Sequence, residues 1–412
     1  MSSHKQQRYD LIVIGGGAAG FFGAINAAEI SSGLRVLILE KSTKLLSKVK
    51  VSGGGRCNVT HYCFSPAPLS QHYPRGQRPL KNLFHHFQAT ETVAWFEKHG
   101  VKLKAEEDGR MFPVTDDSQT IIDLFLEAAK KFKIEIQLSQ EVVRIEKKEE
   151  QFIVHTTNDQ FLSKKILVAM GGHNKIENYK WLAESGHEIV KPIPSLFTFN
   201  DSEKEFTNLM GVAVPDAEVK IASTKFSQRG PVLITHWGLS GPAIIKLSAW
   251  AADYLHEQNY TFTALVNWTG SPETEIRYTL MELKQTNSKK QITSSALFNL
   301  PKRLWEQLCA KAEIEDKKIW ADLPDKSINR LIELLYCCSF KIRGKTTFKE
   351  EFVTCGGVAL SDVDINTMES KKAPGLYFAG EVLNMDGETG GFNFQAAWTT
   401  SYVAAKAIST KK

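Results

Sequence analysis

A glycine-rich turn near the N-terminus constrains the fold more than any other feature of the sequence. Residues 9–14 are mostly apolar, Tyr-Asp-Leu-Ile-Val-Ile, and Gly-Gly-Gly-Ala-Ala-Gly follows at 15–20. In a dinucleotide-binding unit such glycines permit a tight turn, close approach of the backbone to a pyrophosphate, and close packing of a helix on a strand. The segment therefore predicts a buried parallel strand, a phosphate-binding turn and a helix that continues through Ala28.

A second apolar run supports this prediction. Residues 35–39 lead into Glu40, which lies twenty positions after Gly20. A carboxylate in this position accepts hydrogen bonds from the ribose of an adenosine. The order of strand, glycines, helix, strand and acid predicts the adenosine diphosphate half of a nucleotide site.

The last sixty residues supply the other half of that site. An apolar segment at 375–379 ends in Gly380-Glu381, where a carboxylate could hold a ribityl chain. The glycine-rich residues 386–391 then precede a predicted helix from about Asn393 to Ile408. The positive end of a helix suits the negative charge of a reduced flavin ring. The two ends of the chain together predict one FAD site.

Other classes of protein are less consistent with the sequence. Residues 11–28 are uncharged, but five of these 18 residues are glycine, so we expect no signal peptide and no transmembrane helix. Six cysteines without a Cys-x-x-Cys pair predict neither disulfides nor a zinc site and favour the reducing cytoplasm. His85 and His86 are interpreted as surface or packing residues, and no metal site is expected.

The remaining patterns indicate a discontinuous domain. A helix is predicted over 119–132, a strand over 134–138, an antiparallel pair over 141–146 and 151–156, and a strand over 165–172 that runs into paired glycines. Short β-rich segments then extend to residue 268, and helical patterns follow. We predict an α/β protein whose FAD-binding domain of the Rossmann type (1–190 and 345–412) contains an inserted antiparallel β-subdomain (191–270) and an inserted helical subdomain (271–344).

Several blocks resemble one known family. Residues 52–58, 110–113, 235–242, 353–358 and 380–393 are similar in sequence and order to the aminoacetone-oxidase-like family of bacterial FAD flavoproteins. The resemblance covers essentially the whole chain. It implies non-covalent FAD, a fold with two dinucleotide-binding motifs, and β-rich and helical subdomains. Members of the family have been linked to amine oxidation, to reduction of steroid-like enones, and to reduction of a uridine in ribosomal RNA.

The resemblance also implies which residues meet the cofactor. Glycines of the first turn would face the pyrophosphate, Glu40 the ribose, the backbone of Val143 the adenine, Glu381 the ribityl chain, and the backbone of residues 391–393 the pyrimidine end of the flavin. Residues 56–58 would lie near the flavin or its phosphate. The predicted cofactor-binding residues are Gly15, Gly17, Ala18, Ala19, Gly20, Glu40, Lys41, Arg56, Cys57, Asn58, Val143, Gly171, Gly380, Glu381, Gly391, Phe392 and Asn393.

The sequence leaves the catalytic groups open, because the flavin itself performs hydride chemistry. His236 could act as a general acid or base, or could only hydrogen-bond within a turn. Cys355, beside paired glycines, could donate a proton to a substrate carbon or could be a small buried residue.

Three functions remain as hypotheses. The first is an FAD-dependent oxidoreductase acting on an unidentified small molecule. The second is an RNA-modifying flavoenzyme, favoured by a pI near 8.7 and by basic segments at residues 4–8, 130–133 and 341–345. The third is a non-catalytic flavin-binding or sensor protein. A second Gly-x-Gly-x-x-Gly does not occur, so NADH or NADPH would visit the flavin transiently. We expect no association with a membrane and no obligate protein partner.

Overall fold

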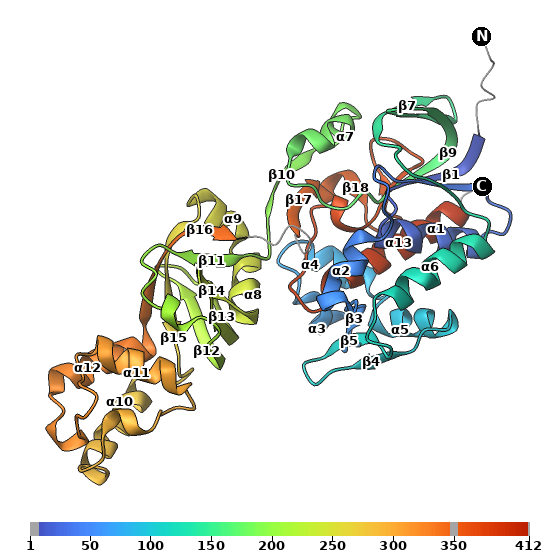
Figure 1. Cartoon of the computed structure of the whole chain (residues 1–412). Coiled ribbons are helices and arrows are strands. Elements are labelled where there is room, and N and C mark those ends of the chain that lie inside the picture. Colours follow the sequence, from blue (N-terminus) through green and yellow to red (C-terminus); the bar gives the residue numbers. More distant parts are fainter. Residues whose placement is uncertain (1–7, 347–352, 411–412) are drawn as a thin grey trace. The chain divides into compact units, whose positions relative to one another are not determined.

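The computed structural model describes residues 8–346 and 353–410 (Figure 1). The chain divides into two compact units, residues 1–195 with 349–412 and residues 196–348. Each unit has its own hydrophobic core among the described residues. The fold class is confirmed: a Rossmann-type domain, built from both ends of the chain, carries an inserted antiparallel unit.

The first unit is built on a mixed sheet. Its strands run in the order β18 (Val363–Asp364), β19 (Glu369–Ser370), β20 (Leu376–Phe378), β9 (Gln160–Val168), β1 (Arg8–Ile14), β2 (Val36–Leu39) and β6 (Glu135–Gln137). A hairpin of β7 (Val142–Lys148) and β8 (Gln151–Thr156) extends from β9. Pairing is parallel from β20 to β6. All four residues of β2 are buried, as expected of a strand covered on both faces.

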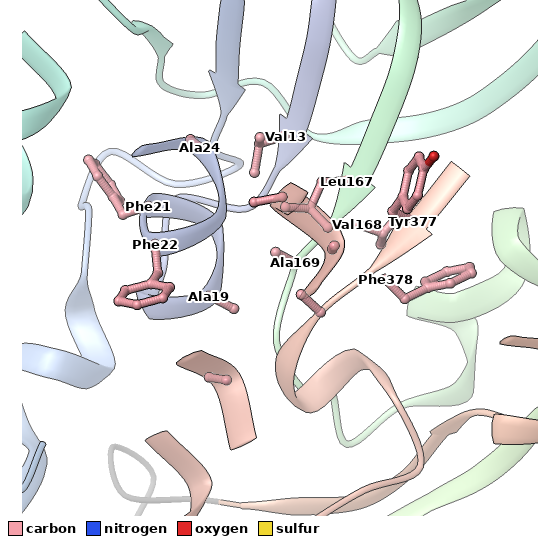
Figure 2. Close-up of a cluster of buried hydrophobic side chains, with 14 of the residues drawn as sticks. Val13, Ala19, Phe21, Phe22, Ala24, Leu167, Val168, Ala169, Tyr377 and Phe378 are labelled. Carbon is pink, nitrogen blue, oxygen red and sulfur yellow. The ribbon is translucent and has the colours of Figure 1, made fainter. Parts of the chain in front are cut away.

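Two helices from opposite ends of the chain pack side by side in this unit, α1 (Ala18–Ile30) and α13 (Phe392–Thr410). Ser401 of α13 donates a hydrogen bond of 2.9 Å to the carbonyl oxygen of Ala19. A Cβ atom on Gly23 would lie 2.5 Å from Leu167 of β9, so glycine permits close packing of α1 on the sheet. Figure 2 shows side chains of α1 together with those of β9, of Ala169 just after β9, and of β20 in this core, including Ala19, Phe21, Phe22, Ala24, Leu167, Val168, Tyr377 and Phe378.

The other elements of the first unit surround the sheet. The helices are α2 (Ser47–Gly55), α3 (Pro66–Ser70), α4 (Gln77–Leu83), α5 (Ala89–Lys98), α6 (Gln119–Lys131) and α7 (Lys180–Glu184), with short 3₁₀ turns at Ile176–Tyr179, Leu360–Asp362 and Gly380–Val382. Strands β3 (Thr60–His61), β5 (Arg110–Pro113) and β4 (Leu103–Ala105) form one small sheet, and β10 (Ile189–Pro194) pairs with β17 (Thr354–Val358).

The second unit is a closed antiparallel barrel with a helical insertion. The barrel order is β11 (Thr198–Asp201), β14 (Gly238–Ser240), β13 (Ser227–Ile234), β12 (Ala213–Ile221), β15 (Thr261–Asn267) and β16 (Cys338–Thr346). Helices α8 (Pro242–Trp250) and α9 (Ala252–Glu257) follow β14, and a 3₁₀ turn lies at Thr207–Leu209. The insertion between β15 and β16 contains α10 (Glu273–Thr286), α11 (Lys302–Lys311) and α12 (Asp325–Tyr336), with 3₁₀ turns at Ile292–Ser294 and Trp320–Asp322.

The observed boundaries differ from the predicted ones in three places. Strand β10 extends into the predicted β-subdomain, which was expected to begin at residue 191, but it pairs with β17, so the first unit continues to Ser195. The predicted helical subdomain at 271–344 extends into β16, whose buried Cys338, Phe340 and Ile342 alternate with exposed residues and close the barrel. Helices α8 and α9 lie in the region predicted to be β-rich. Within residues 8–346 and 353–410, no helix has the length and apolar character needed to cross a membrane.

The separate cores generate a stability prediction. Leu335 of α12 is fully buried in the second unit, whereas the neighbouring Tyr336 is 41% exposed. Leu335→Ala should lower the free energy of unfolding of the second unit by about 2–5 kcal/mol, because it removes buried methyl groups and leaves a cavity. Tyr336→Ala, the control, should have a much smaller effect. Hydrogen exchange of peptides from each unit tests this, and equal loss of protection in both units would contradict separate cores.

Candidate functional site

The carboxyl ends of four parallel strands form one edge of the sheet in the first unit. Ile14 of β1 lies opposite both Leu39 of β2 and Val168 of β9, and Val168 lies opposite Phe378 of β20. The hydrogen bonds continue past the strand ends, from Gly15 N–H to Leu39 and from Ala169 N–H to Ile14. This edge therefore brings Gly15, Glu40, Gly171 and Gly380 together, where ligands of open α/β sheets bind.

The glycines of the first turn have different physical roles. Gly15 has φ of +112°, and a Cβ atom there would lie 2.4 Å from the carbonyl oxygen of Ala169. A Cβ atom on Gly20 would lie 1.9 Å from the carbonyl oxygen of Gly15. A Cβ atom on Gly17 would meet no protein atom within 4 Å. Gly15 and Gly20 are thus required by the fold, whereas Gly17 leaves an open cradle at the N-terminus of α1, next to Ala18 and Ala19.

Glu40 braces the glycine turn from the end of β2. One carboxylate oxygen accepts the N–H of Gly16 at 2.8 Å, and the other accepts the N–H of Ser42 at 2.9 Å. Each oxygen has further lone pairs for a ribose hydroxyl. The sequence predicted the ligand role but not the bracing role.

A cavity of about 340 Å³ opens beside this turn. Its lining residues include Gly15, Glu40, Lys41, Val143, Met170, His173 and Trp181. Val143, for which the resemblance implies contact with adenine, is 48% exposed and lies at this cavity with the ribose-side residues. Burial, reinforced by Lys41 and Lys48, lowers the pKa of His173 to about 4, so this imidazole is neutral near pH 7.

Glu381 connects three segments of the first unit, namely α2, β17 and the glycines after β9. Its carboxylate forms an ion pair of 2.6 Å with Lys48 of α2 and accepts the N–H of Thr354 at 3.0 Å. A Cβ atom on Gly172 would lie 2.7 Å from the same carboxylate. Lys48 was not among the predicted site residues. Its partner lies 333 positions away, so no local pattern could identify it.

Residues 386–391, here called the glycine loop, lead into α13 and are held by a buried ion pair. Asp386 is fully buried, and both of its carboxylate oxygens lie 2.5 Å from guanidinium nitrogens of Arg75. Ser195 donates a further hydrogen bond of 2.8 Å to Asp386. Asn393 exchanges two 2.9 Å hydrogen bonds with the backbone of Gly387. The Asn393 side chain is therefore committed to the loop, which leaves backbone groups at the start of α13 for a cofactor.

Two histidines that the sequence did not identify lie against Phe392 at the start of α13. The His72 ring stacks on Phe392 with centroids 4.1 Å apart, and the His61 ring lies 4.6 Å from it. Nδ1 of His72 is 3.2 Å from the buried carboxylate of Glu388, and Nδ1 of His61 is 3.0 Å from the carbonyl oxygen of Gly390. The loop thus carries two carboxylates, at 386 and 388, and each faces a basic side chain.

The three consecutive residues predicted at 56–58 have different surroundings in the structure. Asn58 accepts the N–H of Met111 at 3.2 Å and would lie 2.9 Å from a Cβ atom on Gly391, so it packs against the glycine loop. Arg56 instead pairs with Glu106 at 2.5 Å. Cys57 is fully buried, and burial raises the pKa of its thiol to about 12. The Cys57 thiol therefore stays protonated and is unsuited to nucleophilic chemistry.

The two catalytic candidates lie in different units. Cys355 is buried in β17, where its thiol donates to the carbonyl oxygen of Ile193 at 3.6 Å. His236 is exposed in the turn between β13 and β14, with its ring 4.3 Å from that of Trp237. Their catalytic roles stay predictions. Among the described residues, no group of three His, Cys, Asp or Glu side chains could hold a metal ion.

Comparison with known proteins identifies the family. A family model described as HI0933-like protein Rossmann domain matches residues 9–407. The chain belongs to this family. It is 29% identical over 415 residues to ribosomal RNA dihydrouridine synthase of Escherichia coli (strain K12), covering 98% of this chain and 99% of that protein. It is also 25% identical over 413 residues to 3-dehydro-bile acid delta(4,6)-reductase of Clostridium scindens, covering 97% and 98%.

The fold is also found among solved structures. The chain is similar to 3-ketosteroid-delta4-(5alpha)-dehydrogenase from Rhodococcus jostii RHA1, with a TM-score of 0.54 and 12% identity over 100% of this chain and 99% of that chain. The predicted family and fold are confirmed. Family membership, the Rossmann fold and the cofactor motifs are those of an FAD-dependent oxidoreductase.

The residues of the first unit fit FAD. The open cradle at Gly17 would receive the pyrophosphate, the cavity beside Glu40 and Val143 the adenosine, and the backbone at the start of α13 the flavin ring. Gly15 to Glu40 would hold the adenosine diphosphate half, and Glu381 the ribityl chain. When bound, FAD supplies hydride chemistry that amino-acid side chains lack.

The open cradle generates a prediction about cofactor binding. Gly17→Val should abolish FAD binding, because its side chain would fill the space at the α1 N-terminus, where a Cβ atom meets no protein atom within 4 Å. The thermal unfolding of the FAD-free variant should match that of the FAD-free wild type. Released flavin measured after denaturation tests this, and a variant that copurifies with FAD would contradict the assignment.

His173 generates a prediction about pH. Its pKa in the folded chain, about 4, lies below its ordinary value of 6.5, so between these values the unfolded chain binds a proton that the folded chain does not. The free energy of unfolding of the FAD-free protein should therefore fall as pH decreases from about 6.5 to about 4. His173→Gln should reduce this dependence. Urea unfolding at several pH values tests this, and an unchanged pH slope would contradict it.

Proposed function

We propose that the protein adds hydrogen across a carbon–carbon double bond conjugated to a carbonyl group, and that its substrate is a uridine in ribosomal RNA. The observation that carries the proposal is the end-to-end similarity to ribosomal RNA dihydrouridine synthase. Dihydrouridine differs from uridine by saturation of one double bond beside a carbonyl. The bile acid relative is also named as a reductase, so both curated relatives fit this class of reaction.

The electrostatics of the glycine loop support a reductase. Arg75 neutralises Asp386, and His72 faces Glu388. Each carboxylate of the loop therefore has a partner, so neither acts as an isolated negative charge near the positive end of α13. A helix N-terminus stabilises negative charge that lies close to it. The start of α13 would therefore favour the reduced, anionic form of a flavin whose pyrimidine end lies there.

The reaction also needs a proton donor, because one carbon of the double bond receives a hydride and the other a proton. Cys355 and His236 are the candidates from the sequence. The structure adds His72, whose Nδ1 is held by a buried carboxylate, as is common in proton-transferring histidines. The electron donor would be NADH or NADPH, which would visit the flavin transiently. Both this donor and ribosomal RNA are cytoplasmic, so we place the protein in the cytoplasm.

A small-molecule enone is the second candidate substrate, favoured by the similarity to the bile acid reductase. A non-catalytic flavin-binding protein is the third hypothesis. The three differ in what reoxidises the reduced flavin, so one experiment separates them.

We expect NADPH or NADH to reduce the bound flavin under anaerobic conditions. Ribosomal RNA from a strain that lacks this protein should then reoxidise it, because that RNA retains the unreduced uridine. RNA from the parent strain is the matched control and should not reoxidise it. The flavin absorbance reports the electron transfer, and mass spectrometry of nucleosides should show dihydrouridine formed only in the first RNA.

Three outcomes would contradict the proposal. Reoxidation by a steroid enone but by neither RNA would favour the small-molecule substrate. Rapid reoxidation by oxygen alone would indicate an oxidase, and a flavin that no donor reduces would favour the non-catalytic hypothesis.

A further inference from the structure

The segment that holds the glycine loop is unusual in its charge. Residues 41–90 contain no Asp or Glu, although the chain's 46 acidic residues in 412 would place about five or six in a run of this length. The same run contains eight Lys or Arg residues and four His. A polyanion is therefore not repelled by this segment's own side chains.

Part of this positive charge is neutralised by residues from elsewhere in the chain. Lys48, Arg56 and Arg75 pair with Glu381, Glu106 and Asp386, respectively. Arg78 and Lys81, three positions apart on α4, are exposed, and their side chains form no hydrogen bond or ion pair with any described residue. Their charges are available to a partner.

Two exposed aromatic rings follow β3 in the same segment. Tyr62 is 60% exposed and Phe64 is 40% exposed, and their centroids lie 4.5 Å apart with the rings edge to face. Exposed aromatic faces beside basic residues are the usual platform for unpaired nucleobases.

Both features are tied to the glycine loop. His61, the residue before Tyr62, contacts the carbonyl oxygen of Gly390. At the other end, Arg75 binds Asp386, and a Cβ atom on Gly76, the residue before α4, would lie 2.8 Å from Met385. The residue before the aromatic pair therefore contacts one end of the glycine loop, and the residues before α4 contact its other end.

One acidic element lies beside Tyr62, the turn between β4 and β5. The N–H of Tyr62 donates to the carbonyl oxygen of Gly109 in this turn. Arg110 forms ion pairs with both Glu106 and Asp108, which lowers their repulsion of a phosphate. Glu107 is exposed and is the remaining carboxylate of the turn.

We propose that Tyr62, Phe64, Arg78 and Lys81, here called the loop rim, form a binding site for single-stranded RNA next to the glycine loop. The rings stack on unpaired bases, and the two cations contact phosphates. A base must leave its stack to react with a flavin, so a single-stranded binding site beside the loop suits the reaction. This inference rests on the proposed function in that it takes RNA as the substrate.

The test uses the FAD-loaded protein and a fluorescein-labelled, single-stranded 12-nucleotide RNA of mixed sequence that contains uridine. The dissociation constant is measured by anisotropy at several salt concentrations. Tyr62→Ala and Phe64→Ala should each weaken binding at least about fivefold. Tyr62→Phe should bind RNA as tightly as the wild type, because the aromatic ring is kept. The double variant Arg78→Gln/Lys81→Gln should lower the slope of log affinity against log salt by about 1.4, or about 0.7 for each phosphate contact.

Matched controls lie in the second unit. Tyr278 on α10 is 70% exposed, and Lys326 is an exposed lysine on α12. Tyr278→Ala and Lys326→Gln should leave RNA affinity unchanged. Unchanged FAD content and flavin absorbance in all variants would show that the FAD site is intact.

The outcomes separate the loop rim from the proposed function. If the wild type binds and reduces RNA but the loop-rim variants do so equally well, the RNA lies elsewhere and this inference is wrong while the function stands. Equal loss of binding to single-stranded RNA and to duplex DNA would indicate a general polyanion patch and would also overturn it. A wild type that neither binds nor reduces RNA would overturn the proposed function itself.

Discussion

The packing of α1 against α13 joins the two ends of the chain, and the cofactor site depends on it. Ser401 bonds to the backbone of Ala19 in the first turn of α1, close to the open cradle at Gly17. In the sheet, β9 lies between N-terminal β1 and C-terminal β20. Without this junction Gly15 and Glu381, 366 positions apart in the sequence, would not reach the same edge. The second unit can be inserted between them because neither its core nor its barrel contributes to this edge.

Buried charge gives the glycine loop its shape. Burial raises the pKa of Asp386, and the paired Arg75 opposes that effect by holding the carboxylate with two hydrogen bonds. Removing one partner of such a pair leaves an uncompensated charge in the interior, which costs more than the pair contributes. The loop is therefore fixed before a cofactor arrives, and the N–H groups at the start of α13 are oriented in advance.

Local patterns predicted the parts of the site that follow from backbone geometry. The glycine turn, the acid at the end of β2 and the helix after residue 391 all depend on neighbours within a few positions, so the sequence was sufficient. Lys48, His72 and Arg75 could not be predicted in the same way, because their partners lie more than 300 positions away. The pairing of Arg56 with the carboxylate of Glu106 is likewise not visible in local sequence, and the prediction that Arg56 lies near the flavin or its phosphate stays a prediction.

The boundary errors have a topological cause. Strand β16 pairs with β11 on one side and with β15 on the other, so the barrel closes only after the helical insertion has been traversed. A linear division into a β-rich and a helical region cannot represent a strand that returns to the barrel, although the alternation of Cys338, Phe340 and Ile342 is visible in the sequence. The first unit has the same property on a larger scale, because β17 and β20 complete sheets begun before the insertion. In both units, therefore, strands from late in the chain complete sheets that begin with earlier strands. The sheet edge that would hold the cofactor cannot form until α13 is available.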